Sequence, residues 1–248
     1  MCAQPETGAG VLHGFAQVLR HRGALVQGSL REQQWMAQAG ADGLARAHLW
    51  SAPAGLVAPR SYARLPGWQA ACARQQAQGC AVELRASGGG VVPQGPGLLN
   101  LSLVWPLADA ATADIDAIYR GLAALLADAL APLGLELRPG AVAGSFCDGR
   151  YNLAVGARKC IGTAQAWRRQ GGRQVVLAHA LLIVRADAQR LCDWLNDFEA
   201  DAGGERRYAA QAITSLEQAW CEARRRAPPA RDFERRVVAC LLRALRGA

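Results

Sequence analysis

The sequence reads Gly156-Ala157-Arg158-Lys159-Cys160-Ile161-Gly162-Thr163-Ala164-Gln165 a little past its middle. The chain has 28 lysine and arginine residues, and Lys159 is the only lysine among them. Arginine thus supplies ordinary positive charge, whereas lysine offers a compact ammonium whose pKa shifts readily on burial. We therefore expect a chemical role for Lys159; the alternative is a single lysine left by chance in an arginine-rich chain.

The residues around this segment predict a β-hairpin followed by a buried strand. The stretch 151–155, a turn at Gly156-Ala157 and the residues from Lys159 onward indicate two antiparallel strands. The run 175–184 is apolar except for His179 and indicates a further strand. A histidine in such a strand is more often a structural residue than a catalytic one, and both roles stay open for His179.

Hydrophobic periodicity extends the prediction to the whole chain. Helices are expected at 11–20, 30–47, 68–78, 113–133, 187–196, 211–223 and 233–245, and strands at 55–58, 81–85 and 98–104. Strand pairs mixed with separate helices predict an α+β fold with a mostly antiparallel sheet. Residues 1–223 should form one domain that also includes the basic helix of 224–248, because the clearest break, Pro228-Pro229, sets off only that helix.

Composition narrows the class of protein. Hydrophobic residues make up 51% and charged residues 19%, which is typical of a globular protein. No apolar run approaches the roughly 18 residues of a membrane helix, and no secretory signal is recognisable, so we expect a cytoplasmic protein with no membrane partner. The 8 cysteines contain no C-x-x-C pair, which argues against a zinc site.

The net charge of +8 would suit nucleic acid, an anionic membrane or an acidic protein. The arginine-rich C-terminal tail carries no aromatic platform, so we do not expect nucleic-acid binding. The charge alone does not choose between the other two partners.

Two further segments carry groups that could act in chemistry. Arg85 ends an expected strand, and Ser87 and the glycines Gly88, Gly89 and Gly90 follow it, where backbone N–H groups could approach a ligand closely. Cys147 precedes the hairpin, and a thiol becomes nucleophilic as its thiolate when a cation lies nearby. The plain alternatives are a glycine-rich connection and a buried, inert cysteine.

Together these segments resemble the lipoate–protein ligase and octanoyltransferase family of the biotin/lipoate ligase superfamily. The family pattern has an arginine pair, a small residue, a Ser or Thr and three glycines, then G-x-K-[IV]-x-G-[ST]-A-Q, then a strand with a central histidine. The matching residues are Arg85, Ser87, Gly88–Gly90, Gly156, Lys159, Gly162, Thr163, Ala164, Gln165 and His179. The segments Trp194-Leu195-Asn196 and Ala212-Ile213-Thr214-Ser215-Leu216 also resemble the ligase pattern.

The resemblance implies a central mixed sheet flanked by helices, as in biotin ligases and class II aminoacyl-tRNA synthetases. It also implies an acyl tunnel roofed by the glycines, with the essential lysine, here Lys159, at its mouth. The substrate-binding residues implied are Arg85, Ser87, Gly88, Gly89, Gly90, Asn152, Gly162, Thr163, Ala164, Gln165 and His179.

The sequence departs from the family's ligases in three places. Leu84 replaces an arginine, Pro93-Gln94-Gly95 replaces a His-Asp step, and Asn152 stands where ligases carry a carboxylate useful for magnesium. Cys147, twelve positions before Lys159, matches instead the cysteine nucleophile of some octanoyltransferases and amidotransferases in the family. No metal site is expected, and ATP and magnesium would be needed only by the ligase alternative.

The expected function is transfer of an octanoyl or lipoyl group from an acyl carrier protein or a lipoyl protein to the lysine of a lipoyl-domain acceptor. The route would be a thioester on Cys147. The alternatives are an ATP-dependent lipoate ligase that forms an acyl-adenylate, a biotin ligase, and a non-catalytic protein that binds acylated or lipoylated partners.

Overall fold

The computed structural model describes residues 14–85, 88–107, 114–225 and 232–247. Its largest element is a seven-stranded sheet in the order β1-β2-β6-β10-β9-β8-β7. Its strands are β1 (Gln17–Arg22), β2 (Arg46–Ser51), β6 (Leu98–Pro106), β7 (Arg138–Pro139), β8 (Leu153–Val155), β9 (Arg158–Gln170) and β10 (Arg173–Ile183). β1 and β2 pair in parallel, while the other described neighbours pair antiparallel. The predicted α+β class and the mixed, mostly antiparallel sheet are confirmed.

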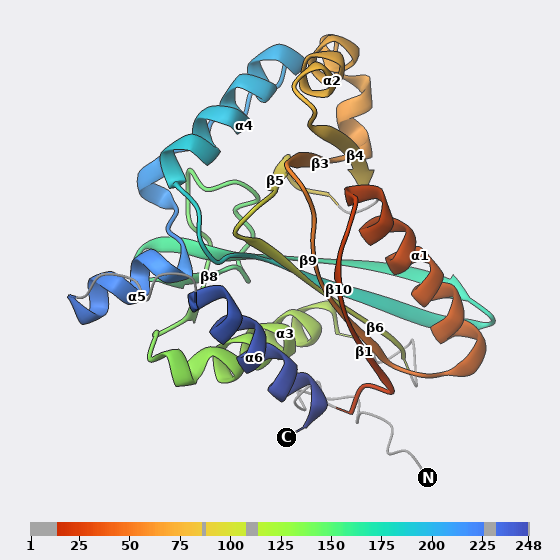
Figure 1. Cartoon of the computed structure of the whole chain (residues 1–248). Helices are drawn as coiled ribbons and strands as arrows, with labels where there is room; N and C mark the ends of the chain where they lie inside the picture. Colours follow the sequence, from red (N-terminus) through yellow and green to blue (C-terminus); the bar gives the residue numbers. More distant parts are fainter. Residues whose placement is uncertain (1–13, 86–87, 108–113, 226–231, 248) are drawn as a thin grey trace.

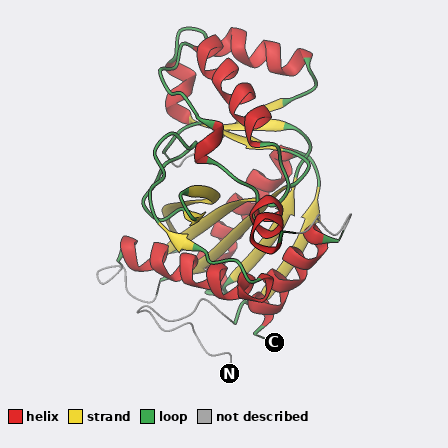
Figure 2. Ribbon diagram, turned by 90° about the vertical axis from the view of Figure 1, so that its left-hand side faces the viewer, coloured by secondary structure: helices red, strands yellow, loops and turns green. Residues whose placement is uncertain are grey.

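A small sheet stands above one face of the large sheet (Figures 1 and 2). Its order is β4 (Ala81–Arg85), β3 (Gly55–Pro59) and β5 (Val92–Gln94). The helices α2 (Trp68–Ala77) and α4 (Ala188–Ala202) lie on its outer side, and α1 (Leu25–Asp42) packs against the same face of the large sheet. The space between the two sheets is where the site lies.

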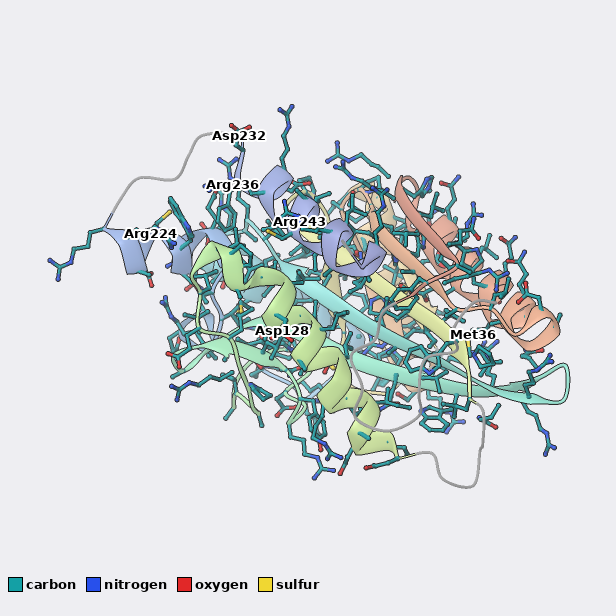
Figure 3. All side chains as sticks on the ribbon, turned by 90° about the horizontal axis from the view of Figure 1, so that it is seen from below. Met36, Asp128, Arg224, Asp232, Arg236 and Arg243 are labelled. Atoms are coloured by element: carbon teal, nitrogen blue, oxygen red, sulfur yellow. The ribbon has the colours of Figure 1, made fainter. Side chains whose placement is uncertain are left out.

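The opposite face of the large sheet carries the main core. The helices α3 (Ile115–Leu130) and α6 (Phe233–Arg246) cover it, and α5 (Leu216–Arg224) adjoins them (Figure 1). α6 buries an apolar stripe against this core, made of Phe233, Val237, Val238, Leu241 and Leu245. Seen from below, α6 lies beside α3 and directs Arg236 and Arg243 outward (Figure 3). None of the helices in the described part of the chain is long and apolar enough to cross a membrane.

The helix predicted at 11–20 is wrong wherever the structure describes it. Residues 17–20 belong to β1, which pairs in parallel with β2, and residues 11–13 lie outside the described chain. Val18 packs on the main core, and this contact with distant residues outweighs the local helical spacing.

The boundaries of other helices also differ from the prediction; the one predicted at 187–196, for example, runs on to Ala202. The helix predicted at 30–47 begins earlier and ends at Asp42, because Gly43 takes the left-handed conformation (φ 76°) that terminates helices. Arg46 and Ala47 then start β2. The helix predicted at 211–223 begins at Leu216, where the Ser215 hydroxyl caps it by accepting from the N–H of Gln218 at 3.1 Å. The predicted hairpin, by contrast, is confirmed as β8 and β9.

Candidate functional site

A pocket opens between α1, the small sheet and the inner face of the large sheet. Its empty volume is about 1080 Å³, including its open mouth. The predicted residues that line it are Arg85, Cys147, Lys159, Gly162, Thr163, Ala164, Gln165 and His179. The structure therefore brings together residues from β4, β9, β10 and the connection before β8 (Figure 1).

The alternation of β9 and β10 explains the shape of the pocket floor. Side chains along a strand point alternately to the two faces of a sheet. On β10, Ala178, Ala180 and Leu182 enter the main core. His179, between them, faces the pocket, and its partner on β9 is Ala164. Leu181 is paired with Gly162 in the same way, so small residues on β9 leave space above the floor.

Lys159 lies at the inner wall with its side chain 0% exposed. Its ammonium donates hydrogen bonds to the carbonyl oxygens of Phe146 and Cys147, the latter at 2.8 Å. The Phe146 ring centre lies 4.8 Å from Nζ, which adds a cation–π contact. Burial lowers the pKa of Lys159 from 10.5 to about 8, although the charges of Cys147 and Asp148 oppose this shift.

Cys147 sits in a strained turn held by several donors. Its φ is 52°, a left-handed value that residues other than glycine rarely adopt. Its carbonyl accepts from Lys159, from Nδ2 of Asn152 at 2.5 Å and from the N–H of Gly149 at 2.9 Å. The thiol is partly exposed, and a Cβ at Gly89 would lie only 2.8 Å from its sulfur. The sulfur thus lies directly against the backbone of the glycine loop, as we call residues 88–90.

Arg85 holds this glycine loop from the other side. Its guanidinium donates to the carbonyls of Val57 at 2.8 Å, Gly88 at 3.0 Å and Gly90 at 2.7 Å. Its Nη2 would lie 3.1 Å from a Cβ at Gly89, the same point that the sulfur approaches. Burial lowers the pKa of Arg85, and the nearby Cys147 opposes this shift. The predicted residue Ser87 lies outside the described chain.

Asn152 and Thr163 support the turn through hydrogen bonds to the chain's own backbone, whereas Gln165 bonds to the backbone at the start of α3. Oδ1 of Asn152 accepts from the N–H of Thr163 at 2.9 Å, while its amide nitrogen donates to Cys147. The Thr163 hydroxyl donates to the carbonyl of Tyr151 at 3.0 Å, and Nε2 of Gln165 donates to that of Ile115 at 2.9 Å. Asn152 is therefore committed at both ends of its amide and brings no carboxylate to the pocket.

A polar network lies at the His179 side of the pocket, and most of it was not predicted. Nδ1 of His179 lies 3.0 Å from Oε1 of Glu32 and 3.1 Å from the Ser102 hydroxyl. Asn100 lies 3.3 Å from Nε2 of His179 and exchanges two hydrogen bonds with Gln94. Burial opposes ionisation of Glu32, but the attraction of His179 and hydrogen bonds from His179 and Ser102 hold its pKa below 4.5.

The residues of this network that were not predicted share a recognisable feature in the sequence. Glu32 precedes Trp35 and Met36 by three and four positions, so it shares their buried helix face. Asn100 and Ser102 occupy one face of β6, beside His179 on the neighbouring strand. A polar side chain on an otherwise apolar face is the feature that could have identified them.

Comparison with known proteins identifies relatives of this chain. The family model described as the lipoyl protein ligase A/B catalytic domain matches residues 35–241. A Cupriavidus necator protein of uncharacterized function is 44% identical over 80% of this chain and 83% of its own length. An octanoyl-[GcvH]:protein N-octanoyltransferase of Kyrpidia tusciae is 42% identical over 57% of this chain. That match spans 51% of the transferase, about half its length.

Solved structures show the same fold at low sequence identity. Lipoate-protein ligase A bound with ATP superimposes with a TM-score of 0.59 at 18% identity, over 92% of this chain and 94% of that one. A Thermoplasma acidophilum protein assigned as a lipoate protein ligase, solved with lipoic acid, gives 0.62 at 17% identity, over 93% and 86% of the two chains. These likenesses establish the fold.

Proposed function

The chain belongs to the lipoyl protein ligase A/B catalytic domain family, and we propose that it transfers an octanoyl or lipoyl group to a lysine of a lipoyl-domain protein through a thioester on Cys147. The similarity to named octanoyltransferases, and to a Listeria monocytogenes lipoyltransferase at 29% identity, supports an acyltransferase. The observation that carries the cysteine route is the sulfur of Cys147 against Gly89, with Lys159 bound to the same turn.

The first step forms the acyl-enzyme. The Cys147 thiolate attacks the acyl carbon of the donor, so that a carbon–sulfur bond forms and the bond from acyl carbon to donor breaks. The donor departs with the proton that Cys147 gave up. Lys159 and Arg85 bring positive charge to the surroundings of Cys147. Backbone N–H groups of the glycine loop, which lies against the sulfur, would donate to the developing oxyanion.

The second step passes the acyl group on. The neutral amine of the acceptor lysine attacks the thioester, a carbon–nitrogen bond forms, and the carbon–sulfur bond breaks. The amine loses a proton as Cys147 regains one, so the enzyme returns to its starting state. Because the acyl group passes from the donor to Cys147 and then to the acceptor without release as a free acid, this sequence consumes no ATP.

The donor is proposed from the names of the relatives, which designate an acylated GcvH protein as the donor of those enzymes. An octanoyl thioester on acyl carrier protein is the second candidate, and either donor can deliver the acyl carbon to Cys147. We expect the acceptor to be a lipoyl domain in both cases.

The test is intact-protein mass spectrometry after mixing the chain with octanoyl-GcvH or octanoyl-acyl carrier protein, without ATP. We expect a gain of one octanoyl group that hydroxylamine releases and that Cys147→Ala lacks. Cys160→Ala is the matched control, because burial raises the pKa of the Cys160 thiol to about 12 and that thiol donates to a backbone carbonyl. No adduct, together with modification of a lipoyl domain by free lipoate and ATP, would replace this proposal with the ligase route.

A further inference from the structure

A buried glutamate on α4 lies behind the glycine loop and takes no part in the steps above. The side chain of Glu199 is 0% exposed. Its Oε1 accepts hydrogen bonds from the hydroxyls of Tyr62 at 2.5 Å and Tyr208 at 2.7 Å. A carboxylate removed from water is costly unless such bonds satisfy it, so the two tyrosines keep Glu199 in this position.

The carboxylate has little freedom to choose other partners. A Cβ at Gly204 would lie 2.0 Å from Oε2 of Glu199, so the turn after α4 closes tightly over this oxygen. Oε2 has no hydrogen-bond partner among the described residues. Glu199 is therefore held by Oε1 alone, and its two tyrosine bonds fix where those hydroxyls lie.

Both tyrosines reach the end of the glycine loop. The hydroxyl oxygen of Tyr62 accepts from the N–H of Val91 at 3.3 Å. The hydroxyl of Tyr208 would lie 2.6 Å from a Cβ at Gly90, so it packs directly on that backbone. Since Gly89 lies against the sulfur of Cys147, the position of this loop determines the surroundings of the thiol.

Tyr208 also connects α4 to the wall that carries Lys159. Asn196, one turn before Glu199, accepts from the N–H of Tyr208 at 2.8 Å and donates to its carbonyl at 2.9 Å. The Tyr208 ring meets Phe146 edge-on at 6.4 Å, and Phe146 in turn contacts the ammonium of Lys159. Asn196 belongs to a segment that resembles the family pattern, and its two hydrogen bonds to the backbone of Tyr208 give it a structural role.

Both hydroxyls keep their protons at neutral pH. Burial, followed by the hydrogen bond and charge of Glu199, raises the pKa of Tyr62 to about 12. The same causes raise the pKa of Tyr208 above its usual range. Each tyrosine therefore donates to the carboxylate, and Tyr62 keeps a lone pair for Val91.

We propose that Glu199 is a positioning residue for acyl transfer: through Tyr62 and Tyr208 it fixes the glycine loop against the sulfur of Cys147. The inference rests on the proposed function for its catalytic meaning. Its structural content, that the Glu199 carboxylate orders residues 88–91, can be tested separately.

The test compares Glu199→Gln with the wild type, because the amide keeps the shape and an oxygen acceptor but accepts hydrogen bonds more weakly than a carboxylate. We expect the rate constant for octanoylation of Cys147 to fall roughly 10- to 100-fold, the cost of a small displacement of reacting groups, while KM changes much less. Alkylation of Cys147 by iodoacetamide, followed on its own peptide, should change as well. The amide of Val91 should lose protection in hydrogen exchange.

A double substitution distinguishes positioning from general weakening. In a Tyr208→Phe background, Glu199→Gln should cost less than in the wild type, because the amide weakens the bond from Tyr208 that the phenylalanine has already removed. If Glu199→Gln does not fold, Tyr62→Phe provides the same measurements with only one hydroxyl removed. Asp201→Asn is the matched control, since this carboxylate on the same helix pairs with Arg74 at 2.7 Å, and it should behave as wild type.

Two results would overturn the proposal. One is a wild-type octanoylation rate in Glu199→Gln. The other is a lower octanoylation rate that is fully explained by a smaller fraction of folded protein, while the Val91 amide stays protected from hydrogen exchange. If the wild type itself forms no octanoyl thioester, the proposed function fails. Val91 exchange and Cys147 alkylation then still decide whether Glu199 orders the loop.

Discussion

The ammonium of Lys159 rests on two backbone carbonyls and an aromatic ring instead of a carboxylate. Carbonyl dipoles compensate a buried charge less fully than an acidic partner would, and burial therefore lowers the pKa of Lys159 to about 8. The same contacts hold the carbonyl of Cys147, so the lysine shapes the nucleophile's turn as well as its electrostatic surroundings.

This lowered pKa predicts a pH dependence. Lys159 is protonated below about pH 8 and loses its charge above it, so acyl-enzyme formation should decline as the pH rises through that value. Single-turnover mass spectrometry between about pH 6.5 and about pH 9.5, a range that brackets this pKa, measures the decline in the rate of acyl-enzyme formation. In Lys159→Arg the guanidinium stays charged at these pH values, so any remaining activity should not decline as the pH rises. If this variant shows the same decline as the wild type, the pH dependence belongs to another group.

Gly89 provides a second prediction at the scale of a residue. Its φ is 105°, and an added Cβ would lie 2.8 Å from the sulfur of Cys147. Gly89→Ala should therefore slow octanoylation about tenfold or more, measured by the same assay. Gly88→Ala is the comparison, since a Cβ there meets no described atom within 4 Å, and it should lose much less activity. Equal losses in both variants would contradict this explanation.

Sequence reasoning identified the residues with their own chemical signature and missed those that act through distant partners. Lys159 stood out as the only lysine, and Cys147 as a cysteine shortly before the hairpin; in the structure the Lys159 ammonium donates to the Cys147 carbonyl. Glu199 and Tyr62 are separated by 137 positions, and nothing local links a helical glutamate to that hydroxyl. Their role depends on the tertiary fold, so no short pattern could have revealed it.

At the scale of elements, long periodic segments were predicted well and their ends poorly. β10 and α3 were recognised because their apolar spacing is regular over many residues. β1 was predicted as a helix because its place depends on pairing with β2, which lies beyond a complete helix in the sequence. Parallel pairing of this kind requires a crossover and leaves no local signature.

The packing of α6 on the main core predicts a stability effect. Leu241 is 1% exposed within the stripe that α6 buries there. Leu241→Ala should lower the free energy of unfolding by about 2–5 kcal/mol, as for other buried leucines. Urea unfolding followed by circular dichroism measures this change. The exposed Arg243 on the same helix is the control, and Arg243→Ala should change stability by no more than about 0.5 kcal/mol.

A loss as small in Leu241→Ala as in Arg243→Ala would contradict the packing of α6 on this core.

At the scale of the whole molecule, the net charge of +8 favours encounter with an acidic protein. We expect KM for an acidic lipoyl-domain acceptor to rise several-fold between about 50 and 500 mM salt, because screening weakens surface attraction, while kcat changes little. Steady-state kinetics at several salt concentrations tests this. As a control, the rate of alkylation of Cys147 by a neutral reagent should not depend on salt. A KM that does not change with salt would show that surface charge does not contribute to binding of the acceptor.

The burial of the chain's single lysine has a consequence for the protein as a chemical target. Folded protein presents no ε-amino group to solvent, since Lys159 is the only lysine and is 0% exposed. An enzyme that acylates lysines would thereby offer none of its own for self-modification. Amine-directed reagents should accordingly leave Lys159 unlabelled until the chain unfolds, which makes the appearance of one labelled lysine a direct gauge of the unfolded fraction.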